Sequence, residues 1–314
     1  MMRILALLFL ALLATGASAA DATHEFQDDA GRSVIVPTKP LRIASLHDID
    51  VTIPLIELGV TPIASHGRIG ADAKPYLRSS AILTGVDFDN SGMAFLGAVD
   101  IDLEALAEQK PNLIITAAGR PTPIATLEKI APTVVIDPTR FGTAHAYQKL
   151  AELTGTEAKL AILDRRYRAG IEELKTAVDT KSITVSVIQP LNGKISIYHT
   201  YRALGQVLRD AGFRFPDIIN GIAEGGRVEV SGERLPDVDA DFIFDPYRSD
   251  TGGTSKEDID AMEKVVPDFC SFLKACVGGR YVMVSREEAI SNSYAAMALM
   301  TAIVKSTTAQ RPAK

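Results

Sequence analysis

The chain has 314 residues and carries 33 Lys and Arg against 39 Asp and Glu, a formal charge of −6 with histidine neutral. An acidic chain without a block of basic residues is a poor binder of nucleic acid or of anionic membrane surfaces, so both partner classes are excluded. The length is sufficient for two domains, each with its own core. The only cysteines are Cys270 and Cys276, too few for a disulfide scaffold and without a metal-ligand pattern.

Residues 1–20 have the pattern of a secretory signal peptide. Arg3 gives a positive start, residues 4–14 form an apolar run, and small residues at 17–19 offer a cleavage site. The apolar run is shorter than the roughly 20 residues that a membrane-spanning helix needs. No cysteine follows it directly, so a lipid anchor is not indicated. We therefore expect export to the periplasm.

The segment that follows, residues 21–142, predicts a first α/β lobe. Turn residues at 28–31 separate two short apolar runs and predict a hairpin that stops at Pro37. Strand and helix patterns then alternate, which indicates a mostly parallel sheet covered on both faces. The predicted strands are 42–46, 61–65, 113–116 and 133–136, and the predicted helices are 51–58, 103–109 and 124–130.

A helical linker is predicted over residues 143–180. One helix covers 143–153 and ends at Gly155, and a second covers 156–179 without any proline. The apolar residues of the second helix recur mainly at three- and four-residue steps. At 1.5 Å per residue it would span roughly 36 Å, longer than one small lobe requires. It is therefore interpreted as a rigid strut between two lobes.

The strand–helix pattern restarts in residues 181–314 and predicts a second α/β lobe. The predicted strands are 183–188, 242–244 and 281–284, and the predicted helices are 203–211 and 291–305. The predicted fold is α/β, with two Rossmann-like lobes joined by a long helix and a ligand cleft between them. Cys270 and Cys276 could pair in an oxidising compartment only if a turn separates them; the sequence leaves open whether they pair or are buried as small hydrophobic residues.

Five stretches, in this order, resemble the class III periplasmic binding proteins of ABC importers, which take up ferric siderophores, vitamin B12 or haem. They are DAGRSVIVP with PLRIASL (29–37, 40–46), IDLEAL with KPNLII (101–106, 110–115), LEKIAPTV (127–134), VSGERL with DADFIF (230–235, 239–244), and LKACVGGRYV (273–282). The resemblance implies a monomeric binding protein, not an enzyme, that delivers its ligand to a permease dimer in the inner membrane. It implies no intrinsic cofactor, because the chelator holds the iron.

Ligand contacts are expected in loops beyond the carboxyl ends of the strands. Arginine suits an anionic iron chelate because its planar fork donates to carboxylate, catecholate or hydroxamate oxygens. Tyrosine can stack or hydrogen-bond beside it. The predicted ligand contacts are Arg68, Arg120, Arg227, Arg248, Tyr198, Tyr247, Tyr294 and His47.

Two histidines that follow predicted strands, His47 and His66, raise the alternative of a bare-metal site with Asp48, and His145 and His199 are the other options. No pair has tight ligand spacing, so loop hydrogen bonding is the simpler interpretation. The resemblance assigns a different role to Glu104 and Glu233, one per lobe, as contacts with the permease. Both also begin predicted helices, where a carboxylate is favourable in any case.

The ligand class stays open within the resemblance. The chain has no tryptophan, which weakly favours a hydroxamate or carboxylate siderophore bound by arginine and tyrosine. Haem or a corrinoid is the alternative, and haem would need an axial histidine or tyrosine such as His47, His66 or Tyr198. A secreted α/β hydrolase is an alternative of another class, but the sequence has no Gly-x-Ser-x-Gly, Walker A or His-Glu-x-x-His motif.

Overall fold

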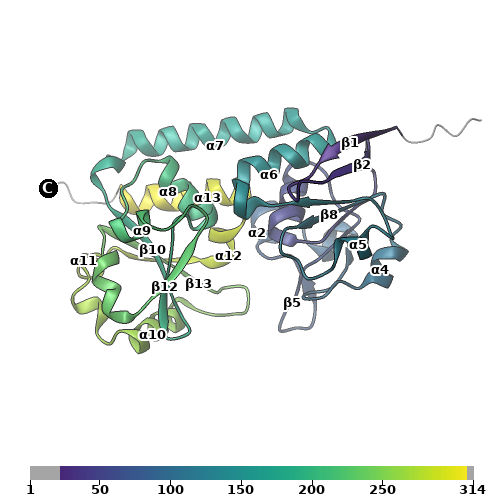
Figure 1. Ribbon diagram of the computed structural model, residues 1–314. Helices are drawn as coiled ribbons and strands as arrows, with labels where there is room; N and C mark the ends of the chain where they lie inside the picture. The colour runs from purple at the N-terminus through teal and green to yellow at the C-terminus, as the bar shows by residue number, and fades with distance from the viewer. Residues whose placement is uncertain (1–21, 310–314) are drawn as a thin grey trace, which may run out of the picture.

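The computed structural model describes residues 22–309 and forms two lobes bridged by one long helix (Figure 1). The predicted signal peptide lies outside the described residues. The described part opens with a hairpin of β1 (Thr23–Gln27) and β2 (Ser33–Pro37), which confirms the predicted hairpin. Its turn is tied to the first lobe because the backbone N–H of Asp137 donates to Asp29 at 2.7 Å.

The first lobe is built on a five-stranded, wholly parallel sheet in the order β7-β4-β3-β8-β9. Its strands are β3 (Ile43–Ser45), β4 (Ala64–Ser65), β7 (Ala94–Phe95), β8 (Leu113–Ala117) and β9 (Thr133–Ile136). The helices are η1 (Asp48–Thr52), α1 (Ile53–Glu57), α2 (Ser80–Thr84), α3 (Phe88–Ser91), α4 (Leu103–Glu108) and α5 (Ile124–Leu127), and a small hairpin joins β5 (Arg68–Ile69) to β6 (Pro75–Tyr76). β8 and β9 are buried along their whole length, as expected for strands covered on both faces.

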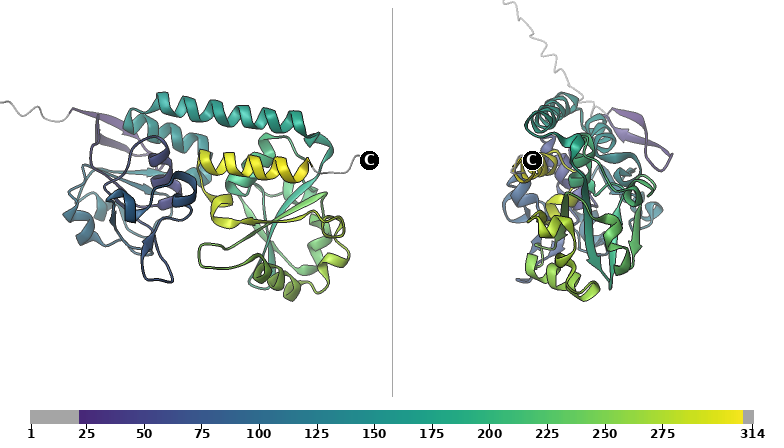
Figure 2. Two further views of the ribbon diagram at one scale, coloured as in Figure 1. Left: turned by 180° about the vertical axis from the view of Figure 1, so that it is seen from behind. Right: turned by 90° about the vertical axis from the view of Figure 1, so that its left-hand side faces the viewer.

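Two helices connect the lobes. α6 (Pro138–Thr154) bends at Gly142, whose φ of 84° is outside the helical region, and ends at Gly155. α7 (Glu157–Ala177) then runs straight for 21 residues along both lobes, which the view from behind shows clearly (Figure 2). Ile171 and Leu174 are its buried residues, while the rest of the helix is solvated or half-buried. The predicted long inter-lobe helix is thus confirmed.

The second lobe has a mixed five-stranded sheet in the order β12-β11-β10-β13-β14. Its strands are β10 (Val185–Leu191), β11 (Lys194–Tyr198), β12 (Arg227–Val230), β13 (Phe242–Tyr247) and β14 (Tyr281–Ser285). The helices are η2 (Thr180–Ser182), α8 (Arg202–Asp210), α9 (Asp217–Asn220), η3 (Gly232–Val238), α10 (Ser255–Val265), η4 (Phe269–Ser271), α11 (Lys274–Val277), α12 (Arg286–Ile290) and α13 (Tyr294–Thr308).

The antiparallel part of this sheet, β10 to β12, was not predicted. β10 and β11 are joined at Asn192-Gly193, and both residues have positive φ, 53° and 72°. An Asn-Gly pair between apolar runs is a strong sequence signal for a tight hairpin. The signal was present in the sequence, and the prediction of strand 183–188 stopped short of it.

The lobes are also tied to each other through Glu57, at the end of α1. Its carboxylate accepts the backbone N–H of Tyr294 at 3.0 Å and of Ala295 at 2.6 Å, and also the Tyr147 hydroxyl. A carboxylate there satisfies the first free N–H groups of α13 and complements the positive end of its dipole. Burial nevertheless raises the pKa of Glu57 above its usual value, because the charge is held almost out of water.

Cys270 and Cys276 form a disulfide, which settles the question that the sequence left open. η4 ends before α11 begins, so a turn separates the two cysteines as pairing requires. No helix among residues 22–309 is both long and apolar enough to cross a membrane.

Candidate functional site

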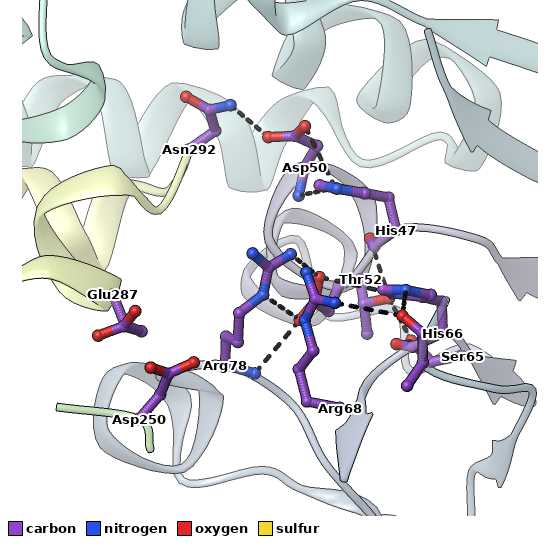
Figure 3. A network of polar contacts seen from close by, with 12 residues as sticks. His47, Asp50, Thr52, Ser65, His66, Arg68, Arg78, Asp250, Glu287 and Asn292 are labelled. Carbon is purple, nitrogen blue, oxygen red and sulfur yellow. Dashed lines mark hydrogen bonds and ion pairs between the residues drawn. The ribbon is translucent and has the colours of Figure 1, made fainter. Parts of the chain in front are cut away.

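The first lobe gathers polar side chains where its parallel strands end, at the junction with the second lobe (Figure 3). His47 and Asp48 follow β3, and His66 follows β4. Beneath them the hydroxyl of Thr52 lies 2.7 Å from that of Ser45 and 2.6 Å from that of Ser65. These buried hydroxyls tie the end of η1 to both strands, so the positions of the side chains around them are fixed.

Asp48 is fully buried and forms a salt bridge with Arg78, which is 8% exposed. The Arg78 Nε donates to one carboxylate oxygen at 2.7 Å, and a terminal nitrogen donates to the other. Burial alone would raise the pKa of Asp48, but the hydrogen bonds and positive charge of Arg78 hold it well below its usual value. The Asp48–Arg78 ion pair is therefore a constant, buried part of the site.

Two of the predicted arginines, Arg68 and Arg120, lie close to Arg78. Arg68 donates to the carbonyl of Ala98 at 3.2 Å, and Arg120 donates to that of Val99 at 3.4 Å. Burial lowers the pKa of each, and the positive charge of Arg78 lowers both further. The Nε of Arg120 is buried without a hydrogen-bond partner among residues 22–309. Guanidinium donors thus converge here with capacity left over for an anion.

The second lobe faces this arginine cluster, Arg68, Arg78 and Arg120, with the loop 248–254. Arg248 directly follows the last residue of β13. Its side chain is 58% exposed and forms a salt bridge with Asp250 at 3.3 Å. Tyr247 is half-buried just before it. Glu287, at the start of α12, lies beside Asp250 and accepts the backbone N–H of Ser249 at 3.2 Å (Figure 3).

Hydrogen bonds between the lobes also cross this junction. The Tyr76 hydroxyl of the first lobe donates to the Asp250 carboxylate of the second at 3.3 Å. Asp50 accepts a hydrogen bond from Arg202 at 3.3 Å and another from Asn292. The arginine cluster is therefore framed by groups from both lobes.

Three other predicted contacts lie elsewhere. Arg227 begins the edge strand β12 and pairs with Glu229 at 3.2 Å, so it does not follow the carboxyl end of a strand. Tyr198 packs edge-on against Tyr201, and both hydroxyls donate to Gln189. Tyr294 is buried between Tyr147 and Tyr167, below α7.

A pocket of about 840 Å³ lies below α7, between the starts of α6 and α13 and the face of α8. Tyr294, Arg202 and Asn292 belong to its lining, so it meets the junction at the groups that bind Asp50. Several charged residues of its lining are already paired within the chain, such as Arg168 with Asp164 and Lys175 with Glu172. The lining of this pocket carries charges of both signs, whereas the arginine cluster is cationic.

His47 and His66 stack with parallel rings 5.9 Å apart. The His47 Nδ1 accepts the backbone N–H of Asp50 at 3.2 Å, and burial lowers the pKa of His47 to about 4. His66 is fully buried, and its Nε2 bonds the carbonyl of Ala98 at 2.7 Å. Among residues 22–309, no group of three or more His, Cys, Asp or Glu side chains is arranged to hold a metal ion.

The two remaining predicted residues, Glu104 and Glu233, are exposed. Glu104 stands in the first turn of α4, which Asp102 caps by accepting its backbone N–H at 3.1 Å. Glu233 stands in the first turn of η3, directly after β12. β12 runs in the same direction as β10, because both are antiparallel to β11, so Glu233 follows a strand end on the side of the sheet where β10 ends.

Sequence comparison finds relatives of this chain. The iron(3+)-hydroxamate-binding protein FhuD of Bacillus subtilis is 33% identical over 171 residues, 50% of this chain and 53% of that protein. The probable siderophore-binding lipoprotein YfiY of Bacillus subtilis is 29% identical over 227 residues, 68% of this chain and 66% of that protein. The matches thus span between about half and two-thirds of the length of these curated relatives.

Solved structures share the fold. Staphylococcus aureus SirA complexed with staphyloferrin B matches with a TM-score of 0.75 at 20% identity, covering 91% of this chain and 98% of that one. A FhuD-fold protein of Bacillus subtilis, described as a component of a ferrichrome ABC transporter, matches with a TM-score of 0.73 at 18% identity, covering 91% of this chain and 100% of that one. The two-lobed α/β fold predicted from the sequence is confirmed.

The family model of the periplasmic binding proteins matches residues 66–264, well over half of the chain. The match includes Arg68, Arg78 and Arg120 as well as the long helix and the loop 248–254. The resemblance drawn from the five motifs is confirmed: this chain belongs to the periplasmic binding protein family.

Proposed function

We propose that this protein captures a ferric siderophore in the periplasm and delivers it to the permease of an ABC importer. The observation that carries the proposal is the arginine cluster of Arg68, Arg78 and Arg120 at the lobe junction, where one Nε still lacks a partner. Many ferric siderophore complexes present anionic oxygens, which guanidinium groups bind through charge-assisted hydrogen bonds. The names of the relatives, which refer to hydroxamate and siderophore binding, support the same ligand class.

The protein's part in this is binding, not covalent chemistry. The ligand would lie between the arginine cluster and the second-lobe residues Tyr247 and Arg248, with the siderophore holding the iron. α7 and the contacts of Asp50 and Glu57 resist a wide hinge motion, so we expect the site to be largely pre-formed. Delivery would use Glu104 and Glu233, one on each lobe, as contacts with a permease dimer by a monomeric binding protein.

Haem and corrinoids are the alternative ligands. A haem iron would need an accessible axial side chain. His66 is fully buried and His47 is largely so, and the ring nitrogens named above already bond the backbone. Tyr198 is engaged with Gln189. The geometry therefore favours the siderophore over haem.

A titration of tyrosine fluorescence tests the function directly. The chain has 8 tyrosines and no tryptophan, so bound iron should quench the tyrosines near the site without background from indole. The panel contains an anionic ferric hydroxycarboxylate chelate, a ferric trihydroxamate, haem and cobalamin, and absorption spectra follow haem separately. We expect saturable quenching by at least one ferric siderophore at micromolar concentration or below. Binding of haem or cobalamin alone would contradict the proposal.

A further inference from the structure

The loop 248–254 holds an acidic side chain where a ligand's anionic group would be expected. The loop leaves the second lobe at the end of β13 and reaches toward the first lobe before α10 begins (Figure 1). Asp250 lies in it with its side chain only 4% exposed, although Arg248 in the same loop is 58% exposed. A carboxylate buried on a loop needs charged or hydrogen-bonding partners to offset its lost hydration.

Those partners come from both lobes. Arg248 donates to Asp250 through Nε and a terminal nitrogen, both at 3.3 Å, and Tyr76 donates its hydroxyl at the same distance. Tyr76 is paired with Arg68 across the β5–β6 hairpin, so its bond to Asp250 brings this carboxylate beside the arginine cluster. The charge of Asp250 accordingly acts to raise the pKa of Arg68 and of Arg78. Burial would raise the pKa of Asp250, but the hydrogen bond from Arg248 lowers it overall, so the group is a carboxylate at neutral pH.

Asp250 has a second buried acid beside it and glycines after it in the loop. Glu287 lies directly beside it and is 1% exposed (Figure 3). Glu287 stabilises the charge of Asp250, because a hydrogen bond between the two side chains lowers the pKa of Asp250. Glu287 is held by Ser249 and Arg286, whereas Asp250 is followed by Gly252 and Gly253 in the same loop. Gly252 has a φ of 78°, a backbone conformation that residues with a side chain adopt only with strain.

We propose that Asp250 is an internal stand-in for the ligand's anionic group: it occupies Arg248 and Tyr76 beside the arginine cluster in the empty protein and is displaced from them by an anionic ferric chelate. The inference rests on the proposed function and names its ligand class. A chelate with carboxylate oxygens would replace Asp250 on Arg248 and Tyr76, whereas a neutral or cationic chelate would leave Asp250 in place. Asp250 thereby selects for anionic chelates that compete well enough to move it.

The test compares Asp250→Asn with a control, Asp260→Asn, on two ferric chelates. The amide keeps an oxygen that can accept from Tyr76 but removes the competing charge. Asp260 lies on α10, 50% exposed and paired with Lys256, so its substitution changes the net charge equally outside the site. The chelates are an anionic ferric hydroxycarboxylate complex and a cationic linear ferric trihydroxamate, titrated by tyrosine quenching and by calorimetry.

We expect Asp250→Asn to bind the anionic chelate about tenfold more tightly, because the chelate no longer competes with a carboxylate for one charge-assisted hydrogen bond. Its affinity for the cationic chelate should be unchanged or weaker, and Asp260→Asn should change neither by more than about twofold. Equal effects on both chelates, or weaker binding of the anionic one by Asp250→Asn, would overturn the inference while leaving the proposed function intact.

A second measurement needs no ligand. Amide hydrogen exchange in residues 248–254 should be faster in Asp250→Asn than in the parent protein, because the loop loses its ionic contact with Arg248. Unchanged exchange there would show that Asp250 does not hold the loop, and would overturn the inference even if no chelate bound. Failure of the parent protein to bind any ferric chelate, with faster loop exchange in the variant, would instead count against the proposed function.

Discussion

The two faces that meet at the lobe junction are built differently. On the first lobe, Arg78 is 9% exposed in its side chain and is locked to the buried Asp48 above a base of hydroxyl groups. On the second lobe, Arg248 is 58% exposed and shares a glycine-containing loop with its partner Asp250. One face is fixed by burial before a ligand arrives, and the other can rearrange around it. A pocket made of one fixed and one adjustable face can be selective for charge without requiring a large hinge motion.

The contrast between the two faces would be wrong if the Asp48–Arg78 ion pair did not stabilise the first lobe. Asp48→Asn leaves Arg78 buried opposite a neutral amide, and breaking a buried pair from one side typically costs about 3–5 kcal/mol. We expect a loss of that order in the free energy of unfolding, measured with urea. The control Asp72→Asn removes an exposed carboxylate 3.8 Å from Lys74 and should cost about 1 kcal/mol at most. A similar loss of unfolding free energy in both variants would mean that the Asp48–Arg78 pair does not stabilise this face.

The stabilisation by the Asp48–Arg78 pair should also depend on pH. The folded-state pKa of Asp48 lies well below the ordinary value of 3.8, so its stabilising contribution is present above that value and is lost as the pH falls through the folded pKa. The stability difference between the parent protein and Asp48→Asn should therefore be constant from neutral pH down to about 4 and shrink below it. A difference that already shrinks near pH 6 would contradict this assignment.

Ligand affinity should depend on the fixed face more than on distant arginines. Arg120→Ala removes a guanidinium with a free buried Nε, and we expect a loss of roughly 1.5–3 kcal/mol in the binding of the tightest ferric siderophore. Arg227→Ala removes an exposed arginine already paired with Glu229 and should leave the affinity within about twofold. If Arg227→Ala lost affinity and Arg120→Ala did not, the ligand site would lie near β12 and not at the lobe junction.

Delivery should be separable from binding. Glu104→Ala and Glu233→Ala remove exposed carboxylates, each contributing about 1 kcal/mol or less to a rim contact, so the double variant should dock to its permease roughly tenfold more weakly. The measurement is uptake in reconstituted vesicles, with chelate affinity unchanged. Glu108→Ala, in the same helix as Glu104, is the control. Reduced chelate affinity in the double variant would argue against a docking role.

The smallest effect is expected at the contact between the two faces. Tyr76→Phe removes the hydroxyl that reaches Asp250, a bond that should stabilise the protein by about 1 kcal/mol or less. Tyr198→Phe removes a hydroxyl that bonds Gln189 within one lobe. Hydrogen exchange should therefore quicken in residues 248–254 only for Tyr76→Phe. Equal changes in both variants would show that the inter-lobe bond is not what steadies the loop.

Much of the fold could be predicted because it follows from local pattern. The hairpin at the start, the alternating strands and helices and the long helix each have a periodicity or turn residues that the sequence displays. The placement of Arg120 near Arg68 also follows from a general rule, since both come after strands of one parallel sheet. These predictions needed no knowledge of contacts between residues far apart.

The residues that were missed depend on such contacts. Arg78 lies in an irregular segment and gains its role only by pairing with Asp48, 30 positions earlier. Asp250 and Glu287 look like ordinary surface acids in the sequence and are buried by contacts that form only in the folded chain. Arg120 and Arg227 each follow a glycine in the sequence. Only the folded structure shows that Arg120 comes after strand β8 whereas Arg227 begins strand β12.

The carboxylate of Glu57 has a consequence for how the molecule comes apart. It belongs to the first lobe yet satisfies the first turn of α13, and the main hydrophobic core runs without interruption from the first sheet through the linking helices into the second. Neither half can melt while leaving the other whole, because each would expose part of its neighbour's interior. Heating should therefore give a single calorimetric transition, with calorimetric and van't Hoff enthalpies that agree, despite the two-part architecture.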